Sequence, residues 1–252
     1  MRTRKETVRR HAGRLERVAR ALYEACVDEG SLATLMPVFD ATTWRATERS
    51  DVAGGAGIRR LSTTHADWPD WSAAVTVLNK TAQEYAHTTG LEIDAEPDVM
   101  FANRQLPSDS GWTFHADGKS RGYEVVTAVL TMRSSDCRGG AIQFSDLADG
   151  SVDEKQYGGR AWMDHVISFH PRHASVYVFP GSLVQHRPTN IAQGTRYSVV
   201  AFYRVRSDYI KFLSVWAGKE HYCHDCEKFY MNKRSFQKHK SADCPSRKRQ
   251  KK

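Results

Sequence analysis

Two stretches near the N-terminus repeat apolar side chains at steps of three and four residues. The first stripe consists of Val8, Ala12, Leu15, Val18, Leu22 and Cys26. The second consists of Trp71, Ala74, Val75, Leu78, Ala82 and Tyr85. Such spacing places each stripe on one face of an α-helix, and Gly90 after the second stripe is a typical helix end. We expect two amphipathic helices, with Cys26 in the core, and a loop over the glycine-rich residues 50–60.

From about residue 97 the pattern changes to short segments rich in β-branched and aromatic residues, separated by Gly, Pro, Asp and Ser. The segments span residues 98–105, 123–132, 141–144, 165–169, 175–179 and 197–205. Strands of this length without intervening helices are typical of a sandwich or jelly roll. The sequence therefore predicts a mainly β domain over residues 96–210, with a helical region of residues 1–95 packed on its outside.

Charge separates the ends of the chain from its middle. The 252 residues carry a net charge of +8, of which residues 1–22 contribute +6 and residues 217–252 contribute +7. Residues 23–216 are therefore acidic, at about −5, and attraction to polyanions is expected at the two ends. No apolar run approaches the roughly 18 residues of a spanning helix, so we expect no membrane association. The cysteine usage and the lack of an apolar leader favour an intracellular protein, nuclear if the basic tail is read as a signal and otherwise cytoplasmic.

One group of residues suggests a metal site. His115 and Asp117 precede the segment 123–132, and residues two apart in an extended chain project to the same face. His186 follows Pro180 and Gly181, a pair that can turn the chain back across the mouth of a barrel. Two histidines and one carboxylate form the facial triad that holds Fe(II) and leaves positions open for a cosubstrate and dioxygen.

Arg196 and Ser198 share a face at the start of the last apolar segment. A guanidinium directed into an apolar sandwich needs an anion. The distal carboxylate of 2-oxoglutarate would accept hydrogen bonds from both nitrogens of the fork, with the Ser198 hydroxyl as a further donor.

The order of these motifs resembles the 2-oxoglutarate- and Fe(II)-dependent dioxygenase superfamily, closest to its prolyl-hydroxylase-like branch, over roughly residues 97–206. The matching features are His115-x-Asp117, the Gly139-Gly140 segment, Phe179-Pro-Gly181, His186 and Gly194-x-Arg196-x-Ser198. The resemblance implies a double-stranded β-helix (jelly roll), iron held by the two histidines and the aspartate, and 2-oxoglutarate held by Arg196, where prolyl hydroxylases often carry Lys. It also implies ascorbate as an activator, and hydroxylation coupled to conversion of 2-oxoglutarate into succinate and carbon dioxide.

The segment before His115 departs from that branch, which usually carries a Tyr there. This chain has Asn103 followed by Arg104, similar to the AlkB-like nucleic acid demethylases, although the spacing to His115 differs from theirs. Asn103, Arg104 and Trp112 are candidate substrate or cosubstrate contacts, and simple packing is the alternative interpretation.

The C-terminal segment 217–252 has the spacing of a zinc finger. Cys223 and Cys226 are followed by His239 and Cys244, which matches a ββα finger whose last His is replaced by Cys. A module of this size depends on zinc for its stability. The basic residues 247–252 could contact phosphates or direct nuclear import, and a solvated tail is the alternative. Fingers also bind proteins.

Three functions follow from these patterns. The first is an oxygenase that hydroxylates a protein side chain, as the closest branch does. The second is an oxygenase that hydroxylates or demethylates a nucleic acid base, which the basic ends favour and the acidic middle disfavours. The third is a catalytically inactive binding protein, which the complete set of proposed iron ligands disfavours.

Overall fold

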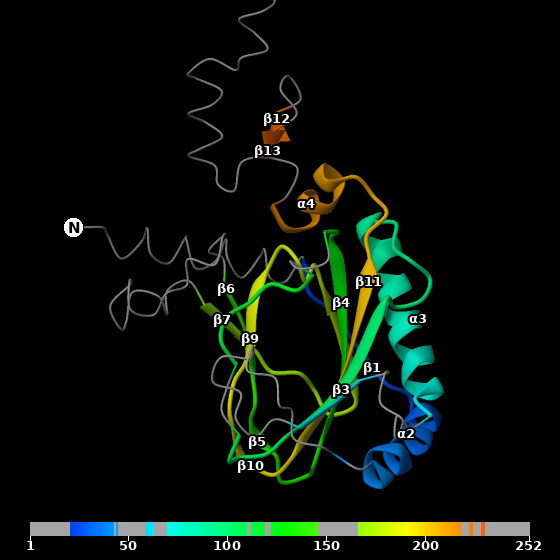
Figure 1. Ribbon diagram of the computed structural model, residues 1–252, viewed down its shortest axis with the longest axis vertical. Coiled ribbons are helices and arrows are strands. Elements are labelled where there is room, and N and C mark those ends of the chain that lie inside the picture. The colour runs from blue at the N-terminus through cyan, green and yellow to red at the C-terminus, as the bar shows by residue number, and fades with distance from the viewer. Residues whose placement is uncertain are drawn as a thin grey trace, which may run out of the picture.

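Two antiparallel sheets face one another in the computed structural model, which describes residues 21–42, 44, 59–62, 70–109, 112–118, 122–145, 166–217, 222–223 and 228–229 (Figure 1). The strands of the major sheet, in the order in which they pair, are β1 (Tyr23–Cys26), β8 (Ser175–Phe179), β4 (Val125–Arg133), β11 (Arg196–Arg204), β3 (Val99–Gln105) and β2 (Arg59–Ser62). The minor sheet consists of β7 (Val166–Phe169), β6 (Ile142–Ser145) and β9 (Gln185–Pro188). Two further pairs join β5 (Arg138–Gly139) to β10 (Ile191–Gln193) and β12 (Tyr222–Cys223) to β13 (Lys228–Phe229). This mainly β architecture is consistent with the predicted jelly roll.

Alternation along the central strands gives the major sheet two different faces. On β11, Val199, Ala201 and Tyr203 are fully buried on the face that packs against the helices. On the same strand, Arg196 and Ser198 project to the other face, toward the minor sheet. Because successive side chains of a strand point to opposite faces, one strand serves both the core and the space between the sheets.

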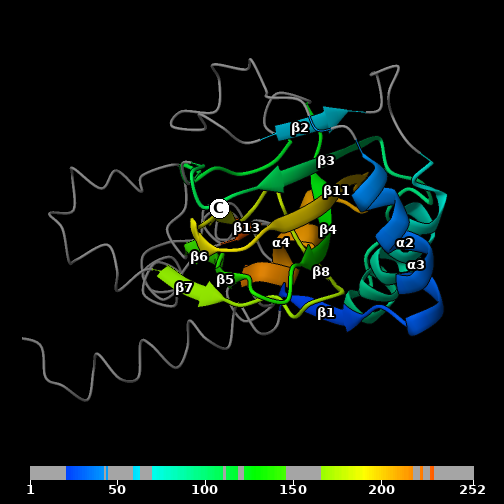
Figure 2. The same ribbon diagram turned by 90° about the horizontal axis from the view of Figure 1, so that it is seen from below.

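Helices α2 (Glu29–Ala41) and α3 (Ser72–Thr89) cover the outer face of the major sheet, and Figure 2 shows the minor sheet on the opposite side. The helix predicted from the second apolar stripe is present as α3. It ends at Gly90, whose φ of 71° closes the helix in the left-handed conformation that glycine adopts at little cost. A short helix, α4 (Tyr209–Ala217), follows β11. No helix in the described residues combines the length and apolar composition that crossing a bilayer requires.

The C-terminal part of the first predicted helix is wrong, since Ala21 is helical but the chain is extended from Tyr23. Residues 1–20 lie outside the described residues, but residues 23–26 form β1, with Tyr23 paired to Val178 and Cys26 to Ser175. Cys26 is exposed and does not belong to the core. From this strand Tyr23 packs against the core.

The N-terminal region also contains elements that the sequence did not predict. Helix α2 contains Pro37, although proline lacks the N–H group that a helix interior uses. Pro37 is exposed, so water can hydrate the carbonyl group that is left without a hydrogen bond. Strand β2 overlaps the predicted loop 50–60 and pairs with β3. Because β1 and β2 belong to the major sheet, that sheet extends beyond the predicted boundary at residue 96, and residues 1–95 are not a purely helical region.

The six predicted β segments each correspond to a strand, within a few residues at their ends. Among the described residues, the strands that the sequence did not predict are short: β1, β2, β5, β9 and β10. Among these, β9 carries His186. Its four residues pair with β6, so His186 lies opposite Phe144.

Candidate functional site

A cavity lies between the two sheets, and its lining changes character along its length. Strand pairing places Asn103, Ser198 and Thr131 side by side in a polar row across β3, β11 and β4. The next row is largely apolar and consists of Phe101, Val200, Val129 and Tyr177. The row after that contains Thr127 and Phe179. The cavity therefore has a polar end beside Arg196 and an apolar middle, and beyond these it reaches His115, Asp117 and His186.

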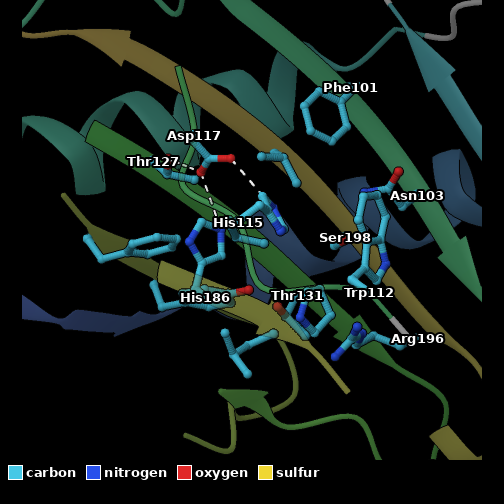
Figure 3. Close-up of a pocket in the computed structure, with 16 residues that line it drawn as sticks. Phe101, Asn103, Trp112, His115, Asp117, Thr127, Thr131, His186, Arg196 and Ser198 are labelled. Carbon is cyan, nitrogen blue, oxygen red and sulfur yellow. Dashed lines mark hydrogen bonds and ion pairs between the residues drawn. The ribbon is translucent and has the colours of Figure 1, made fainter. Parts of the chain in front are cut away.

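His115, Asp117 and His186 converge at one end of the cavity (Figure 3). One potential ligand atom from each residue lies within 4.8 Å of the other two. His115 Nε2 is 3.8 Å from Asp117 Oδ1, and His186 Nε2 is 3.4 Å from Asp117 Oδ2. The two histidines are also joined by their backbones, because each donates its N–H to the carbonyl of the other, over 3.0 and 2.8 Å. The structure thus brings together the three residues that the sequence predicted.

Backbone carbonyls set the orientation of both imidazole rings. His115 Nδ1 is 2.9 Å from the Thr113 carbonyl, and His186 Nδ1 is 2.9 Å from the Val184 carbonyl. A carbonyl only accepts hydrogen bonds, so each Nδ1 carries the proton and each neutral ring keeps the lone pair on Nε2, beside Asp117. Two such nitrogens and one carboxylate suit a divalent metal ion with open coordination positions. The residues present therefore fit a facial triad.

The two histidines differ in exposure. The side chains of His186 and Asp117 are 8% exposed, whereas that of His115 is 36% exposed. Burial lowers the pKa of His186 to about 4, against the opposing charge of Asp117 and with a smaller contribution from His115 in the same direction. His186 is therefore neutral at pH 7, the state in which imidazole binds a metal. Of the three side chains, that of His115 is the one that solvent reaches most.

Asp117 is held from two directions. The Thr127 hydroxyl donates a buried hydrogen bond of 2.7 Å to Asp117 Oδ2, and the Asp117 N–H donates to the Gly181 carbonyl over 3.0 Å. A Cβ atom at Gly181 would lie 1.9 Å from Thr127 Oγ1 and 2.9 Å from Asp117 Oδ2. Gly181 is therefore needed for this close approach of β4 and the segment after β8.

Arg196 is buried at the other end of the cavity. Its guanidinium donates to the Gly140 carbonyl over 2.6 Å and to Gln105 Oε1, both uncharged acceptors, and it forms no ion pair with the described residues. Burial lowers the pKa of Arg196, and Arg133 acts in the same direction, yet an arginine stays protonated in proteins. A buried charge is costly unless it is paired. This end of the cavity therefore suits an anion.

Of the other predicted contacts, three line the cavity and one does not. Asn103, Trp112 and Ser198 line the cavity, and the Trp112 ring lies 5.9 Å from that of His115. Arg104 projects to the opposite face, where its guanidinium carbon is 6.0 Å from the centre of the Trp44 ring. Since neighbouring residues of a strand alternate, Asn103 and Arg104 cannot both face the cavity. The position of Arg104 therefore does not support a contact with substrate or cosubstrate in the cavity.

Sequence reasoning missed several cavity residues, among them Thr127, Thr131 and Tyr177. A signal for two of them existed, because Thr127 and Thr131 are hydroxyl residues on one face of an otherwise apolar strand. Tyr177 lies in β8, a strand that is buried throughout, where nothing distinguished it from core residues.

Of the predicted zinc ligands, Cys223 belongs to the described residues, and only its backbone is described. It lies in β12, which pairs with β13 in antiparallel register, Cys223 opposite Lys228. Cys226, His239 and Cys244 lie outside the described residues.

No protein-family model and no curated protein sequence matches this chain, but many solved structures do. An oxidoreductase of the 2OG-Fe(II) oxygenase family from Burkholderia pseudomallei aligns with a TM-score of 0.54 at 18% identity, over 79% of this chain and 90% of that one. A prolyl hydroxylase from Trichoplax adhaerens, in complex with a hypoxia inducible factor oxygen degradation domain peptide fragment, aligns with a TM-score of 0.52 at 10% identity, over 81% and 94%. HygX from Streptomyces hygroscopicus, with nickel and 2-oxoglutarate bound, aligns with a TM-score of 0.54 at 11% identity, over 81% and 87%. At such identities the likeness concerns the fold, and this chain has the fold of the 2OG-Fe(II) oxygenases.

Proposed function

We propose that this protein is an Fe(II)- and 2-oxoglutarate-dependent dioxygenase that hydroxylates a C–H bond of its substrate. The observation that carries the proposal is one cavity with two complementary ends. At one end His115, Asp117 and His186 present two imidazole nitrogens and a carboxylate to a cation. At the other end Arg196 is a buried cation without a carboxylate partner among the described residues.

Each end has a separate task in the proposed reaction. His115, Asp117 and His186 would hold Fe(II), while Arg196 and Ser198 would hold the distal carboxylate of 2-oxoglutarate. Bound there, iron and 2-oxoglutarate supply the oxidising chemistry: dioxygen is consumed, the substrate gains a hydroxyl group, and 2-oxoglutarate becomes succinate and carbon dioxide. The apolar row between the two ends excludes water. The exposed side of His115 leaves room for the substrate to approach.

The substrate in this proposal is a protein side chain. Support comes from the prolyl hydroxylases among the structures of the same fold, one of which was solved with a peptide fragment. A nucleic acid base is the second candidate, because residues 1–22 and 217–252 carry +6 and +7. A non-catalytic binding protein is the third candidate. It does not explain why the triad occurs together with a buried Arg196 that has no carboxylate partner among the described residues.

The C-terminal segment completes the proposal as a zinc finger with Cys223, Cys226, His239 and Cys244 as ligands. Antiparallel pairing of β12 with β13 supports it, since a ββα finger begins with a hairpin that carries the first two cysteines. The finger and the basic residues 247–252 would recruit a partner, either protein or nucleic acid. Association that weakens as salt is added would favour nucleic acid.

The test is succinate formation by the purified protein with Fe(II), ascorbate and 2-oxoglutarate, with and without a peptide pool or a single-stranded DNA pool. Wild-type turnover that is lost in Arg196→Ala is the expected result, and stimulation by one pool identifies the substrate class. Iron-loaded protein that forms no succinate under any condition would overturn the proposal in favour of the binding protein.

A further inference from the structure

A second cavity lies outside the one that contains the triad, and the two share no lining residue. It is an open hollow of about 650 Å³, within the range of about 300–1,000 Å³ that small-molecule sites occupy. Its lining comes from α2, the end of β4, the segment between β4 and β5, β5 itself and the segment before β8. Figure 1 shows β5 and α2 at the same end of the molecule, away from α4.

The lining of this hollow is basic. Arg133, Arg138 and His173 contribute to it, and no carboxylate of the described residues does. Arg133 donates to the Gly139 carbonyl over 2.8 Å and to the Pro171 carbonyl over 3.3 Å, both uncharged acceptors. Arg138 is exposed, and neither arginine forms an ion pair with the residues that the structure describes. Two positive charges therefore line the hollow without a carboxylate to balance them.

The carboxylates near the hollow are engaged elsewhere. Arg172, which does not line the hollow, has Glu24 as its partner, with 3.0 Å between Arg172 Nε and Glu24 Oε2. Asp136 also lies outside the lining, and it accepts a hydrogen bond of 2.6 Å from the Ser134 hydroxyl. The unbalanced charge of Arg133 and Arg138 therefore suits an anion that comes from solution.

The imidazole of His173 contributes an N–H donor. The backbone N–H of Arg133 donates to His173 Nδ1 over 3.1 Å, so Nδ1 carries no proton and the neutral ring has its proton on Nε2. Directly after this histidine, Ala174 has a φ of 52°, in the left-handed region that a residue with a Cβ atom rarely adopts. Backbone of this kind persists where the surroundings impose it, and it is frequent at ligand sites.

We propose that the hollow binds the phosphate group of a small phosphate monoester. Arg138 supplies charge and a fork of N–H groups, His173 the Nε2 donor and Ser135 a hydroxyl. Because these donors come from three segments of the chain, they suit a tetrahedral group with oxygens in several directions better than a planar carboxylate. Arg133 adds a second positive charge, and Met36 offers an apolar contact to the organic part of the ester. This site is independent of the proposed dioxygenase reaction.

The experiment compares two anions that carry the same ring. Phenyl phosphate and benzoate are titrated into the full-length protein by calorimetry at constant ionic strength. We expect saturable binding of phenyl phosphate and weaker binding of benzoate. Arg138→Gln should bind phenyl phosphate about tenfold more weakly, because it loses a hydrogen bond between charged groups. Since Arg138 is exposed, this variant should unfold at the same temperature as the wild type.

Two control variants place the binding in the hollow. Arg172→Gln removes an arginine next to His173 that does not line the hollow. Arg196→Met removes the buried arginine of the cavity between the sheets, the other place where an anion could bind. Both variants should bind phenyl phosphate with an affinity close to that of the wild type.

Four results would overturn the phosphate site. The first is a wild-type protein that shows no saturable binding of phenyl phosphate. The second is equal weakening in Arg138→Gln and Arg172→Gln, which would mean that only the net charge of the surface matters. The third is a loss of binding in Arg196→Met but not in Arg138→Gln, which would place the anion between the sheets. The fourth is benzoate that binds as tightly as phenyl phosphate.

Discussion

The two ends of the cavity carry opposite charges. At the triad end, Asp117 is negative, both histidines are oriented by backbone carbonyls, and the Thr127 hydroxyl fixes one carboxylate oxygen. At the other end, Arg196 is positive, and among the described residues its guanidinium donates to a backbone carbonyl and an amide oxygen. The first end is arranged for a cation and the second for an anion. A ligand that chelates a metal and carries a carboxylate at its far end satisfies both at once.

The largest effect is expected from removing a histidine of the triad. His115→Ala should reduce succinate formation to background and weaken metal binding by more than about 100-fold, beyond what loss of an outer partner costs. The variant should keep its fold, because the His115 side chain is partly exposed. Metal-dependent thermal shifts and succinate assays measure the two effects. An active His115→Ala enzyme would refute the iron site.

Next in size is a change at the opposite end. Arg196→Met should raise the Kd of 2-oxoglutarate by about 100-fold, the loss expected when one partner of a buried charged pair is truncated. Its metal affinity should stay that of the wild type, because Arg196 does not belong to the triad. Calorimetry with nickel and then with 2-oxoglutarate measures both quantities. A parallel loss of metal binding would show that the two ends are not separable.

A smaller effect is expected at the support of Asp117. Thr127→Val removes the hydroxyl that donates to Asp117 Oδ2 while keeping a similar shape, and metal affinity should fall by about tenfold. Thr127→Ser keeps the hydroxyl and should stay close to the wild type. Titration with Mn(II), followed by electron paramagnetic resonance, compares the two variants. Equal affinities in Thr127→Val and wild type would mean that Asp117 needs no such support.

The smallest effect on the cavity is expected from the C-terminal segment. Cys226→Ser should lower the bound zinc by about one equivalent, since a structural site needs all four ligands. Succinate formation from 2-oxoglutarate alone should be unchanged, because the triad and Arg196 are untouched. Elemental analysis and the succinate assay are the measurements. Retention of all zinc in this variant would contradict the assigned ligands.

The sequence predicted correctly those parts of the molecule whose local residue pattern matches the role that they have in the folded protein. The strands 98–105 and 123–132 have strong β character, and they are present as β3 and β4. The proposed ligands His115, Asp117 and His186 were identifiable because a metal site demands particular residue types in a recurring order. Arg196 was identifiable because a charged residue in an apolar strand is conspicuous.

Other parts depend on partners that lie far away in the chain. Residues 23–26 form a strand because β8 supplies its hydrogen-bond partners, and nothing in their spacing reveals this. Tyr177 is one residue in a uniformly buried strand, and its place in the cavity lining appears only when the sheet pairs β8 with β4. Arg104 was a false candidate for the same reason, since its face of β3 is set by the register of the whole sheet.

The backbone bridge between His115 and His186 has a consequence for folding. These two residues are 71 positions apart, yet each donates its N–H to the other's carbonyl. The bridge closes a long loop, and closing such a loop costs conformational entropy before stabilising contacts can form. The chelating geometry consequently arises only after both sheets have assembled. An added metal ion should therefore slow unfolding without accelerating refolding, since it meets a competent set of ligands only in the finished protein.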